Sequence, residues 1–286
     1  MPLMTKYEPG TPSWVDLGTP DPEAASRFYS DLFGWTISEG PPEAGGYRMC
    51  LLDDKPVAGL GPQMNADAPP SWSTYISVAD ADMTAAAVKE DGGDVLMGPM
   101  DVLDVGRMAV AIDPTGAVFS IWQPRQHAGA AIVNEPNTLC WNELTTRAPQ
   151  KSVEFYGAVF GWTAGLISSK GQPDYTEFRV GDRGVAGMLQ MDDSWPEHIP
   201  NHWMVYFAVD DCEAAVAKAE AFGASVLISP TEVLPGRFAM IKDPQGAVFS
   251  VIALRQAAPD AESQPKSAAE LDPELDPEQH PRLRAD

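Results

Sequence analysis

The chain has 286 residues, 44% of them hydrophobic and 21% charged, so it is long enough to bury a sizeable core and to form two domains of ordinary size. Its formal net charge of -22 repels phosphate backbones and anionic lipid surfaces, so neither nucleic acid nor a membrane is an expected partner. The three cysteines are too few and too dispersed for a disulfide framework, which indicates a reducing compartment. No signal pattern and no apolar run of membrane-helix length is found, and we therefore expect a cytoplasmic protein.

The first elements can be predicted from local patterns. Alternation from Trp14 to Leu17 predicts a strand, and Asp21, Pro22 and Gly34 mark the cap, first residue and end of a helix. Strand patterns follow at 47–52 and 57–63. The same order then starts again, with a strand predicted at 72–78 and a helix at 81–93. Three further strands are predicted at 94–99, 106–112 and 117–123.

The whole pattern then repeats. Residues 14–35, WVDLGTPDPEAASRFYSDLFGW, align with residues 141–162, WNELTTRAPQKSVEFYGAVFGW, and GAVFS recurs at 116–120 and 246–250. A match sustained over this length indicates duplication of an entire domain. We predict domains at 10–126 and 137–256, joined by a linker at 127–136, with two βαβββ modules in each domain.

The C-terminal residues differ in composition. Residues 257–286 contain five prolines and eight acidic residues and have no aromatic residue. Such a segment cannot offset the entropy of ordering, so we predict an acidic disordered tail. The alternative is a short segment around Leu271 and Leu275 that docks on a partner.

Two motifs resemble a known family. FYSDLFGW and FYGAVFGW are similar to a helix end found in the vicinal oxygen chelate superfamily, which includes glyoxalases, extradiol dioxygenases and bleomycin-resistance proteins. DPTGAVFSIW and DPQGAVFSVI are similar to the terminal turn and strand of that family. The chain looks most like a two-domain actinobacterial branch that includes a mycobacterial culture-filtrate antigen. The resemblance implies an α+β fold of tandem glyoxalase-like domains, whose curved mixed sheets form cups that bind a small organic ligand, usually on a divalent metal.

The expected metal ligands are replaced. By the resemblance, the ligand positions fall on Trp14, Ser73 and Ser120 in the first domain and on Trp141, Met204 and Ser250 in the second. Indole, thioether and neutral hydroxyl groups are poor ligands for such cations, so no metal or other cofactor is predicted. His202 lies near one of these positions, but a strand-entry residue is the simpler interpretation.

Other side chains are candidates for chemistry in the cups. Residues two apart on a strand share a face, which places Asp16 beside Trp14 and Glu143 beside Trp141. A carboxylate in a partly apolar cup has a raised pKa and can act as a general base or acid, so Asp16 and Glu143 are the candidate catalytic residues. The alternative is that both are structural hydrogen-bond acceptors. The remaining candidate pocket residues are Tyr75, Ser120 and Trp122 in the first cup and Tyr206 and Ser250 in the second.

Matched arginines, Arg107 and Arg237, precede the two DP turns. An arginine at such a position can hold a ligand's carboxylate or phosphate, and we include both among the pocket candidates. The alternative is that each pairs with a neighbouring acid.

The sequence thus favours a metal-independent protein that binds a small carbonyl-bearing or aromatic compound, as a glyoxalase-like lyase or isomerase. A non-catalytic protein that sequesters an antibiotic or toxin is a second possibility, and a metal-dependent glyoxalase or dioxygenase with displaced ligands is a third. A surface used only for interactions, with both cups filled, is a fourth. The expected partner is a small molecule, with the chain a monomer or homodimer.

Overall fold

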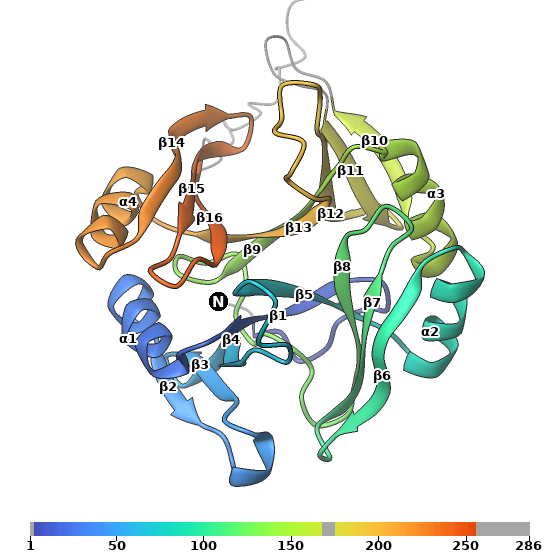
Figure 1. Ribbon diagram of the computed structural model, residues 1–286, viewed down its shortest axis with the longest axis horizontal. Coiled ribbons are helices and arrows are strands. Elements are labelled where there is room, and N and C mark those ends of the chain that lie inside the picture. The colour runs from blue at the N-terminus through green and yellow to red at the C-terminus, as the bar shows by residue number, and fades with distance from the viewer. Residues whose placement is uncertain (1–2, 168–174, 256–286) are drawn as a thin grey trace, which may run out of the picture. The chain divides into compact units, whose positions relative to one another are not determined.

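The computed structural model describes residues 3–167 and 175–255, which Figure 1 shows as a ribbon. The tail predicted at 257–286 lies outside the described residues. In the part of the chain that is described, no helix is long and apolar enough to cross a membrane.

The described residues form four modules of the same order, βαβββ, as predicted. The first module holds β1 (Pro12–Thr19), α1 (Pro22–Phe33), β2 (Thr36–Glu39), the 3₁₀ helix η1 (Pro42–Ala44), β3 (Arg48–Leu52) and β4 (Lys55–Pro62). The second holds β5 (Ser71–Ser77), α2 (Ala81–Glu90), β6 (Asp94–Val102), β7 (Gly106–Ile112) and β8 (Val118–Pro124). The third holds β9 (Leu139–Thr146), α3 (Pro149–Phe160), β10 (Thr163–Ile167), β11 (Tyr175–Val180) and β12 (Arg183–Gln190). The fourth holds β13 (His202–Ala208), α4 (Cys212–Ala221), β14 (Ser225–Val233), β15 (Gly236–Lys242) and β16 (Val248–Leu254).

The first helix begins and ends where its sequence predicts. The Asp21 side chain accepts a hydrogen bond from the amide of Ala24 at 2.9 Å, and Pro22 occupies the first turn, where no backbone donor is required. Gly34 ends the helix with a φ of 73°, a conformation that glycine adopts without the strain of a side chain.

Each half of the chain forms one mixed sheet of eight strands. The strand orders are β2-β3-β4-β1-β5-β8-β7-β6 and β10-β11-β12-β9-β13-β16-β15-β14. In each sheet the two modules meet through antiparallel central strands, β1 with β5 and β9 with β13. The sheets curve, and the helices lie at the outer sides of the molecule, with α1 beside α4 and α2 beside α3 (Figure 1). The α+β architecture of two tandem domains is therefore confirmed.

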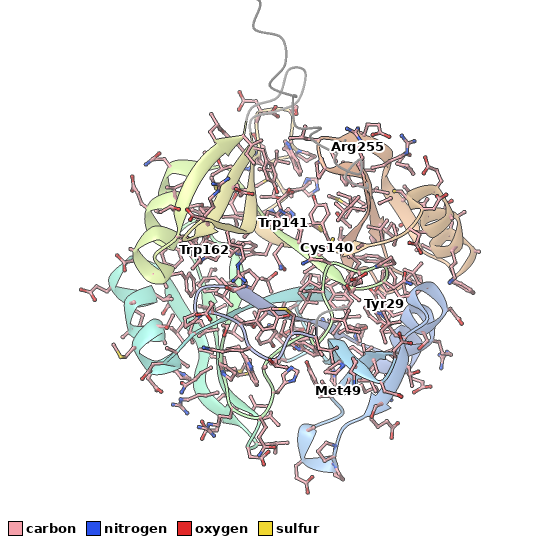
Figure 2. The ribbon with its side chains drawn as sticks, turned by 180° about the vertical axis from the view of Figure 1, so that it is seen from behind. Tyr29, Met49, Cys140, Trp141, Trp162 and Arg255 are labelled. Atoms are coloured by element: carbon pink, nitrogen blue, oxygen red, sulfur yellow. The ribbon has the colours of Figure 1, made fainter. Side chains whose placement is uncertain are left out.

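The two main apolar cores each combine modules from both halves. One core joins residues of the first and fourth modules, including Tyr29 and Phe249, and the other joins the second and third, including Phe119 and Trp162. Figure 2 shows Tyr29 and Trp162 on opposite sides of the molecule. Apolar burial is the main stabilising contribution to folding, so each half depends on the other for its core.

Buried hydrogen bonds connect the same modules. The Tyr29 hydroxyl donates to Asp243 at 2.9 Å, and the Tyr156 hydroxyl donates to Asp113 at 3.0 Å. These tyrosines belong to the repeated FY motifs and the aspartates to the repeated DP turns. The two motifs therefore meet across the halves.

The linker packs against the first half. The amides of Ala130 and Ala131 donate to the carbonyl oxygens of Ser13 and Pro56 at 2.8 and 2.7 Å. The indole of Trp122 donates to the carbonyl of His127 at 2.9 Å. These contacts fix the linker beside the inner face of the first sheet.

Candidate functional site

Each sheet carries an aromatic and methionine cluster on the face that does not pack against the helices. The cluster of the first sheet includes Trp14, Tyr75, Met108 and Trp122, and we call this face the first cup. The corresponding face of the second sheet, around Trp141, Met204, Tyr206 and Ile252, is the second cup. The helical residues belong to the two main cores instead, so the cups are separate from the packing that holds the halves together.

A carboxylate lies in the first cup within a hydrogen-bonded chain. Asp16 Oδ2 accepts from the hydroxyl of Tyr75 at 2.8 Å and from the hydroxyl of Tyr47 at 3.2 Å. The indole of Trp14 donates to the Tyr47 hydroxyl at 2.9 Å. The register places Trp14 opposite Tyr75 and Asp16 opposite Ser73, which brings all of these groups onto one face.

The surroundings of Asp16 change its acidity. Burial raises the pKa of Asp16 to about 6, because an apolar environment disfavours the charged form. The hydrogen bonds from Tyr75 and Tyr47 favour the carboxylate and oppose this rise, but they do not cancel it. Burial, together with the charge of Asp16, raises the pKa values of both tyrosines well above the ordinary value, so both remain protonated donors.

The second cup repeats the arrangement. The Tyr206 hydroxyl donates to Glu143 Oε1 at 3.0 Å, and the indole of Trp141 donates to the Tyr175 hydroxyl at 2.8 Å. Burial raises the pKa of Glu143, and hydrogen bonds from Tyr175 and Tyr206 oppose the change. Both cups therefore hold one carboxylate, two tyrosines and an indole that donates to one of these tyrosines.

Tyr47 and Tyr175 were not identified from the sequence. Their hydroxyls lie against Gly59 and Gly187, where a Cβ atom would collide with them. Both glycines belong to the repeated VAG motif at 57–59 and 185–187. The repeated Gly together with a tyrosine at a matching position in each half was the signal that could have identified both residues.

The histidine of the linker also reaches the first cup. The ring of His127 lies edge-on to Trp14, with centroids 4.5 Å apart, and near Trp122 at 5.8 Å. Burial lowers the pKa of His127 to about 4, so the ring is neutral near pH 7, and its buried Nε2 has no hydrogen-bond partner among the described residues. The sequence placed His127 only in a linker, because its approach to the cup depends on tertiary packing.

Comparison with known proteins identifies the family. The sequence profile of the Glyoxalase/Bleomycin resistance protein/Dioxygenase superfamily matches residues 11–121 and 137–251. The chain belongs to this superfamily. It is 44% identical over 258 residues to "Putative glyoxylase CFP32" of Mycobacterium tuberculosis, covering 88% of this chain and 98% of the relative. It is 38% identical over 273 residues to "Anthracycline biosynthesis protein DnrV" of Streptomyces peucetius, covering 90% of this chain and 98% of the relative.

Solved structures of the superfamily share the fold at low sequence identity. A Mn(II)-bound glyoxalase from Novosphingobium aromaticivorans superposes with a TM-score of 0.60 at 17% identity, over 85% of this chain and 82% of that one. The 2,3-dioxygenase LapB from Pseudomonas sp. KL28 superposes with a TM-score of 0.61 at 16% identity, over 90% and 97% of the two chains.

The side chains in the cups do not fit the metal site that is usual in the superfamily. The indole N–H groups of Trp14 and Trp141 are committed as donors to tyrosines and have no lone pair to offer a cation. Each cup supplies a single carboxylate, and no group of three or more His, Cys, Asp or Glu side chains suited to a metal occurs among residues 3–167 and 175–255. Near the second cup, His202 Nδ1 lies 2.8 Å from the carbonyl oxygen of Pro200.

The matched arginines lie outside the cups. Arg107 donates to both Asp82 and Asp101, and Arg237 donates to Glu213 and Glu232. On their strands both arginines alternate with the cup residues Met108 and Phe238, so they lie on the opposite face. Pairing with neighbouring acids, the alternative that the sequence left open, accounts for both residues, and we do not retain them as pocket candidates.

Proposed function

We propose that the first cup binds a small carbonyl-bearing or aromatic compound and acts on it as a lyase or isomerase, with Asp16 as the general base and without a metal ion. The observation that carries this proposal is the environment of Asp16. A carboxylate with a pKa near 6 is largely ionised at pH 7, yet it is basic enough to accept a proton. Trp14 and Trp122 provide an apolar wall on which a planar ligand can pack.

The two tyrosines suit a proton transfer next to a carbonyl group. When Asp16 takes a proton from the carbon beside the carbonyl, the electron pair of that C–H bond moves onto the carbonyl oxygen as an enolate. A protonated Asp16 is a weaker acceptor than the carboxylate, which frees the Tyr47 and Tyr75 hydroxyls to donate to that enolate. When that carbon also bears a hydroxyl group, as in the hydrate of an α-oxoaldehyde, the hydroxyl proton passes to the enolate oxygen. Asp16 then returns its proton to the former carbonyl carbon, which completes an isomerisation.

The relatives suggest which compounds to test first. The mycobacterial relative is named a glyoxylase, which favours α-oxoaldehydes. The Streptomyces relative is named for anthracycline biosynthesis, which favours aromatic ketones and quinones as a second group. Both groups contain a carbonyl, and the proton transfer selects those members that also carry a C–H bond beside it, such as hydrated α-oxoaldehydes and alkyl-substituted aromatic ketones.

The second cup is the weaker candidate for the same chemistry. Glu143 is only 8% exposed, and Ile252 occupies the place that Trp122 has in the first cup. A ligand would therefore find a less accessible base there.

Amide substitutions test the catalytic role. Asp16→Asn keeps the size of the side chain but removes the base, so we expect turnover of any active α-oxoaldehyde or aromatic ketone to fall about 100-fold or more. Glu143→Gln should have a much smaller effect, and Asp31→Asn, on the exposed surface of α1, is the control. Turnover should also rise with pH around 6 in the unaltered chain and lose this dependence in Asp16→Asn. Unchanged turnover in Asp16→Asn would exclude Asp16 as the base.

Sequestration without catalysis is the second candidate function. Trp14, Tyr75 and Trp122 form an apolar aromatic cluster, a composition that also suits binding of an apolar molecule. Saturable binding of an aromatic ketone with no product formed would favour this function over catalysis.

Metal content tests the third possibility. Because the donor groups of both cups are unsuitable, protein purified without chelators should carry less than about one tenth of a Zn, Ni, Fe or Mn equivalent per chain. Stoichiometric metal by elemental analysis would favour a metal-dependent enzyme with displaced ligands.

A further inference from the structure

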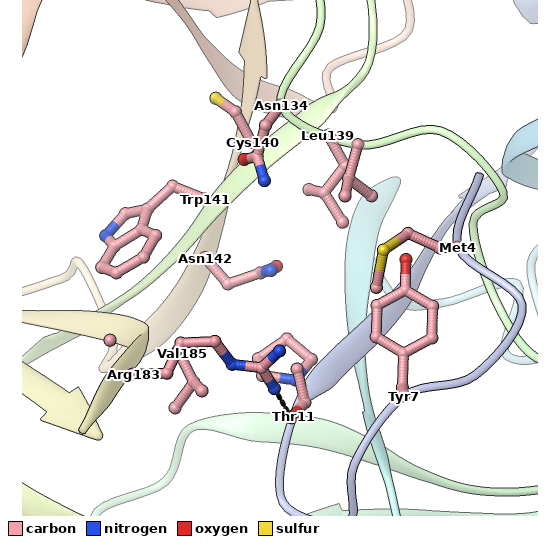
Figure 3. A pocket seen from close by; sticks show the side chains of 13 residues that line it. Met4, Tyr7, Thr11, Asn134, Leu139, Cys140, Trp141, Asn142, Arg183 and Val185 are labelled. Carbon is pink, nitrogen blue, oxygen red and sulfur yellow. Dashed lines mark hydrogen bonds between the residues drawn. The ribbon is translucent and has the colours of Figure 1, made fainter. Parts of the chain in front are cut away.

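A groove lies between the two halves, and neither candidate base is among its lining residues. It has a volume of about 220 Å³ and is formed by the N-terminal segment, the linker, the first residues of β9 and the start of β12. Figure 3 shows its walls, with Met4 and Tyr7 facing Asn142 and Arg183 across the space. None of the lining residues is acidic, although the chain as a whole carries a net charge of -22.

One wall carries an arginine that pairs with no acidic side chain in the described part of the chain. Nine arginines lie in the described part of the chain, and seven of them form ion pairs with carboxylates. Within residues 3–167 and 175–255, the two without an ion pair are Arg147 and Arg183. The guanidinium of Arg183 donates one hydrogen bond, to Thr11 Oγ1 at 2.8 Å. A guanidinium has five N–H donors, so most of its capacity to donate is left for a ligand or solvent.

A buried amide lies in the same groove. Asn142 is 3% exposed, and its Oδ1 accepts from Thr74 at 2.8 Å across the two halves. Its amide group points into the groove (Figure 3), and no hydrogen bond from its nitrogen to another described residue is found. This nitrogen is not among the buried polar atoms that lack a partner, so it is accessible from the groove, where an acceptor from solvent or from a ligand can reach it.

The amide is not part of the repeat, whereas a cationic residue stands at the position of Arg183 in both halves. The position of Asn142 in the second half corresponds to Val15 in the first, which is fully buried and apolar, and that of Arg183 corresponds to Lys55. The fold therefore accepts an aliphatic residue at the position that Asn142 occupies in the second half. The amide is therefore a feature of the second half alone.

We propose that this groove binds a small organic monocarboxylate, whose two oxygens accept hydrogen bonds from Arg183 and Asn142 while its apolar body packs against Met4, Val133 and Leu139. One cationic side chain matches one negative charge, and a planar guanidinium matches a carboxylate. A phosphate dianion would bring two negative charges against a single cationic side chain. The site is independent of the function proposed for the first cup.

Titration of the intact chain with phenylacetate tests the proposal, and 2-phenylethanol serves as the neutral analogue with the same ring. By isothermal titration calorimetry we expect phenylacetate to bind about 10-fold or more tightly than the alcohol. Arg183→Met should remove this preference, and Asn142→Val, which restores the residue type of the first half, should weaken phenylacetate binding several-fold. Arg147→Met, at the other arginine without an ion pair, is the matched control and should bind as the unaltered chain does. Arg183→Gln provides a second variant if Arg183→Met does not fold.

Several results would overturn the proposal. These are equal affinity for phenylacetate and 2-phenylethanol, absence of saturable binding at low millimolar concentration, and phenylacetate binding that survives both Arg183 variants. Loss of binding in Asp16→Asn but not in the Arg183 variants would place the carboxylate in the first cup instead. Tighter binding of inorganic phosphate than of phenylacetate, lost in Arg183→Met, would show that the groove selects a different anion.

Discussion

At the scale of single residues, Asp16 and Glu143 show how an apolar cup and hydrogen bonds act in opposite directions on a carboxylate. Each accepts a hydrogen bond from a buried tyrosine, an interaction that normally lowers the pKa of an acid. Desolvation is nevertheless the largest influence on both, and it raises their pKa values. Two buried groups with raised pKa values at equivalent places in a repeat point to a function, because such groups reduce the stability of the fold.

The destabilisation caused by Asp16 can be measured. Its pKa in the folded chain, about 6, lies above the ordinary value of 3.8, so between these pH values the folded state holds a proton that the unfolded state has released. The free energy of unfolding therefore falls as the pH rises through this range, by up to about 3 kcal/mol, and levels off above it. Asp16→Asn removes this dependence, so its stability relative to the unaltered chain should increase from about pH 4 to about pH 7.

Urea denaturation of the two proteins at a series of pH values provides the measurement. Other titrating groups are common to both proteins and cancel in the difference. A stability difference that stays constant between about pH 4 and pH 7 would show that Asp16 titrates normally.

At the scale of elements, the position of Tyr47 depends on a glycine in the neighbouring strand. In β4, Gly59 pairs with Met49 of β3 and leaves open the space above its Cα, where the hydroxyl of Tyr47 lies. Only this placement brings the hydroxyl within reach of both Trp14 and Asp16. Gly59 does not adopt a positive φ, so the backbone of β4 does not require glycine at this residue. The space that Tyr47 needs explains why the VAG motif has a glycine here.

Gly59→Ala should displace Tyr47 while leaving Asp16 and Tyr75 in place. With one donor lost, we expect turnover in the first cup to fall about 10-fold or more and the pKa read from the pH profile to rise. Gly165→Ala is the control, because a Cβ atom there meets no other atom within 4 Å. Equal turnover in Gly59→Ala and Gly165→Ala would mean that Tyr47 has no role in the chemistry.

The sequence predicts the elements more completely than it predicts the site. Periodicity, the Asp21 cap and Gly34 define α1, and the duplication predicts the four modules. The strand β2, at Thr36–Glu39, was not located, because it is short and mostly exposed and carries no apolar alternation. Tyr47 and His127 enter the first cup only through tertiary contacts across strands and from the linker, which no local pattern records.

At the scale of the whole molecule, the repeat conceals how the halves share their cores. A duplicated sequence has the same pattern whether each module packs within its own half or against the other half. The structure shows the second arrangement, in which Tyr29 of α1 donates to Asp243 and Tyr156 of α3 donates to Asp113. The tryptophans Trp72 and Trp203 donate to the same two hydroxyls at 3.0 and 2.9 Å, which completes a buried network on each side.

Shared cores predict that the two halves unfold together. We expect a single cooperative transition in which tryptophan fluorescence and far-ultraviolet circular dichroism change at the same urea concentration, although the chain is long enough for two independent domains. Tyr29→Phe leaves a buried carboxylate oxygen of Asp243 without its donor and the Trp72 indole without its acceptor. It should therefore lower the free energy of unfolding by about 1–3 kcal/mol. The whole transition should move to lower urea concentration, because Asp243 and Tyr29 lie in different halves. Tyr156→Phe should behave in the same way through Asp113. Two separate transitions, or a shift confined to part of the signal in either variant, would show that each half is stable alone and that the shared cores do not couple them.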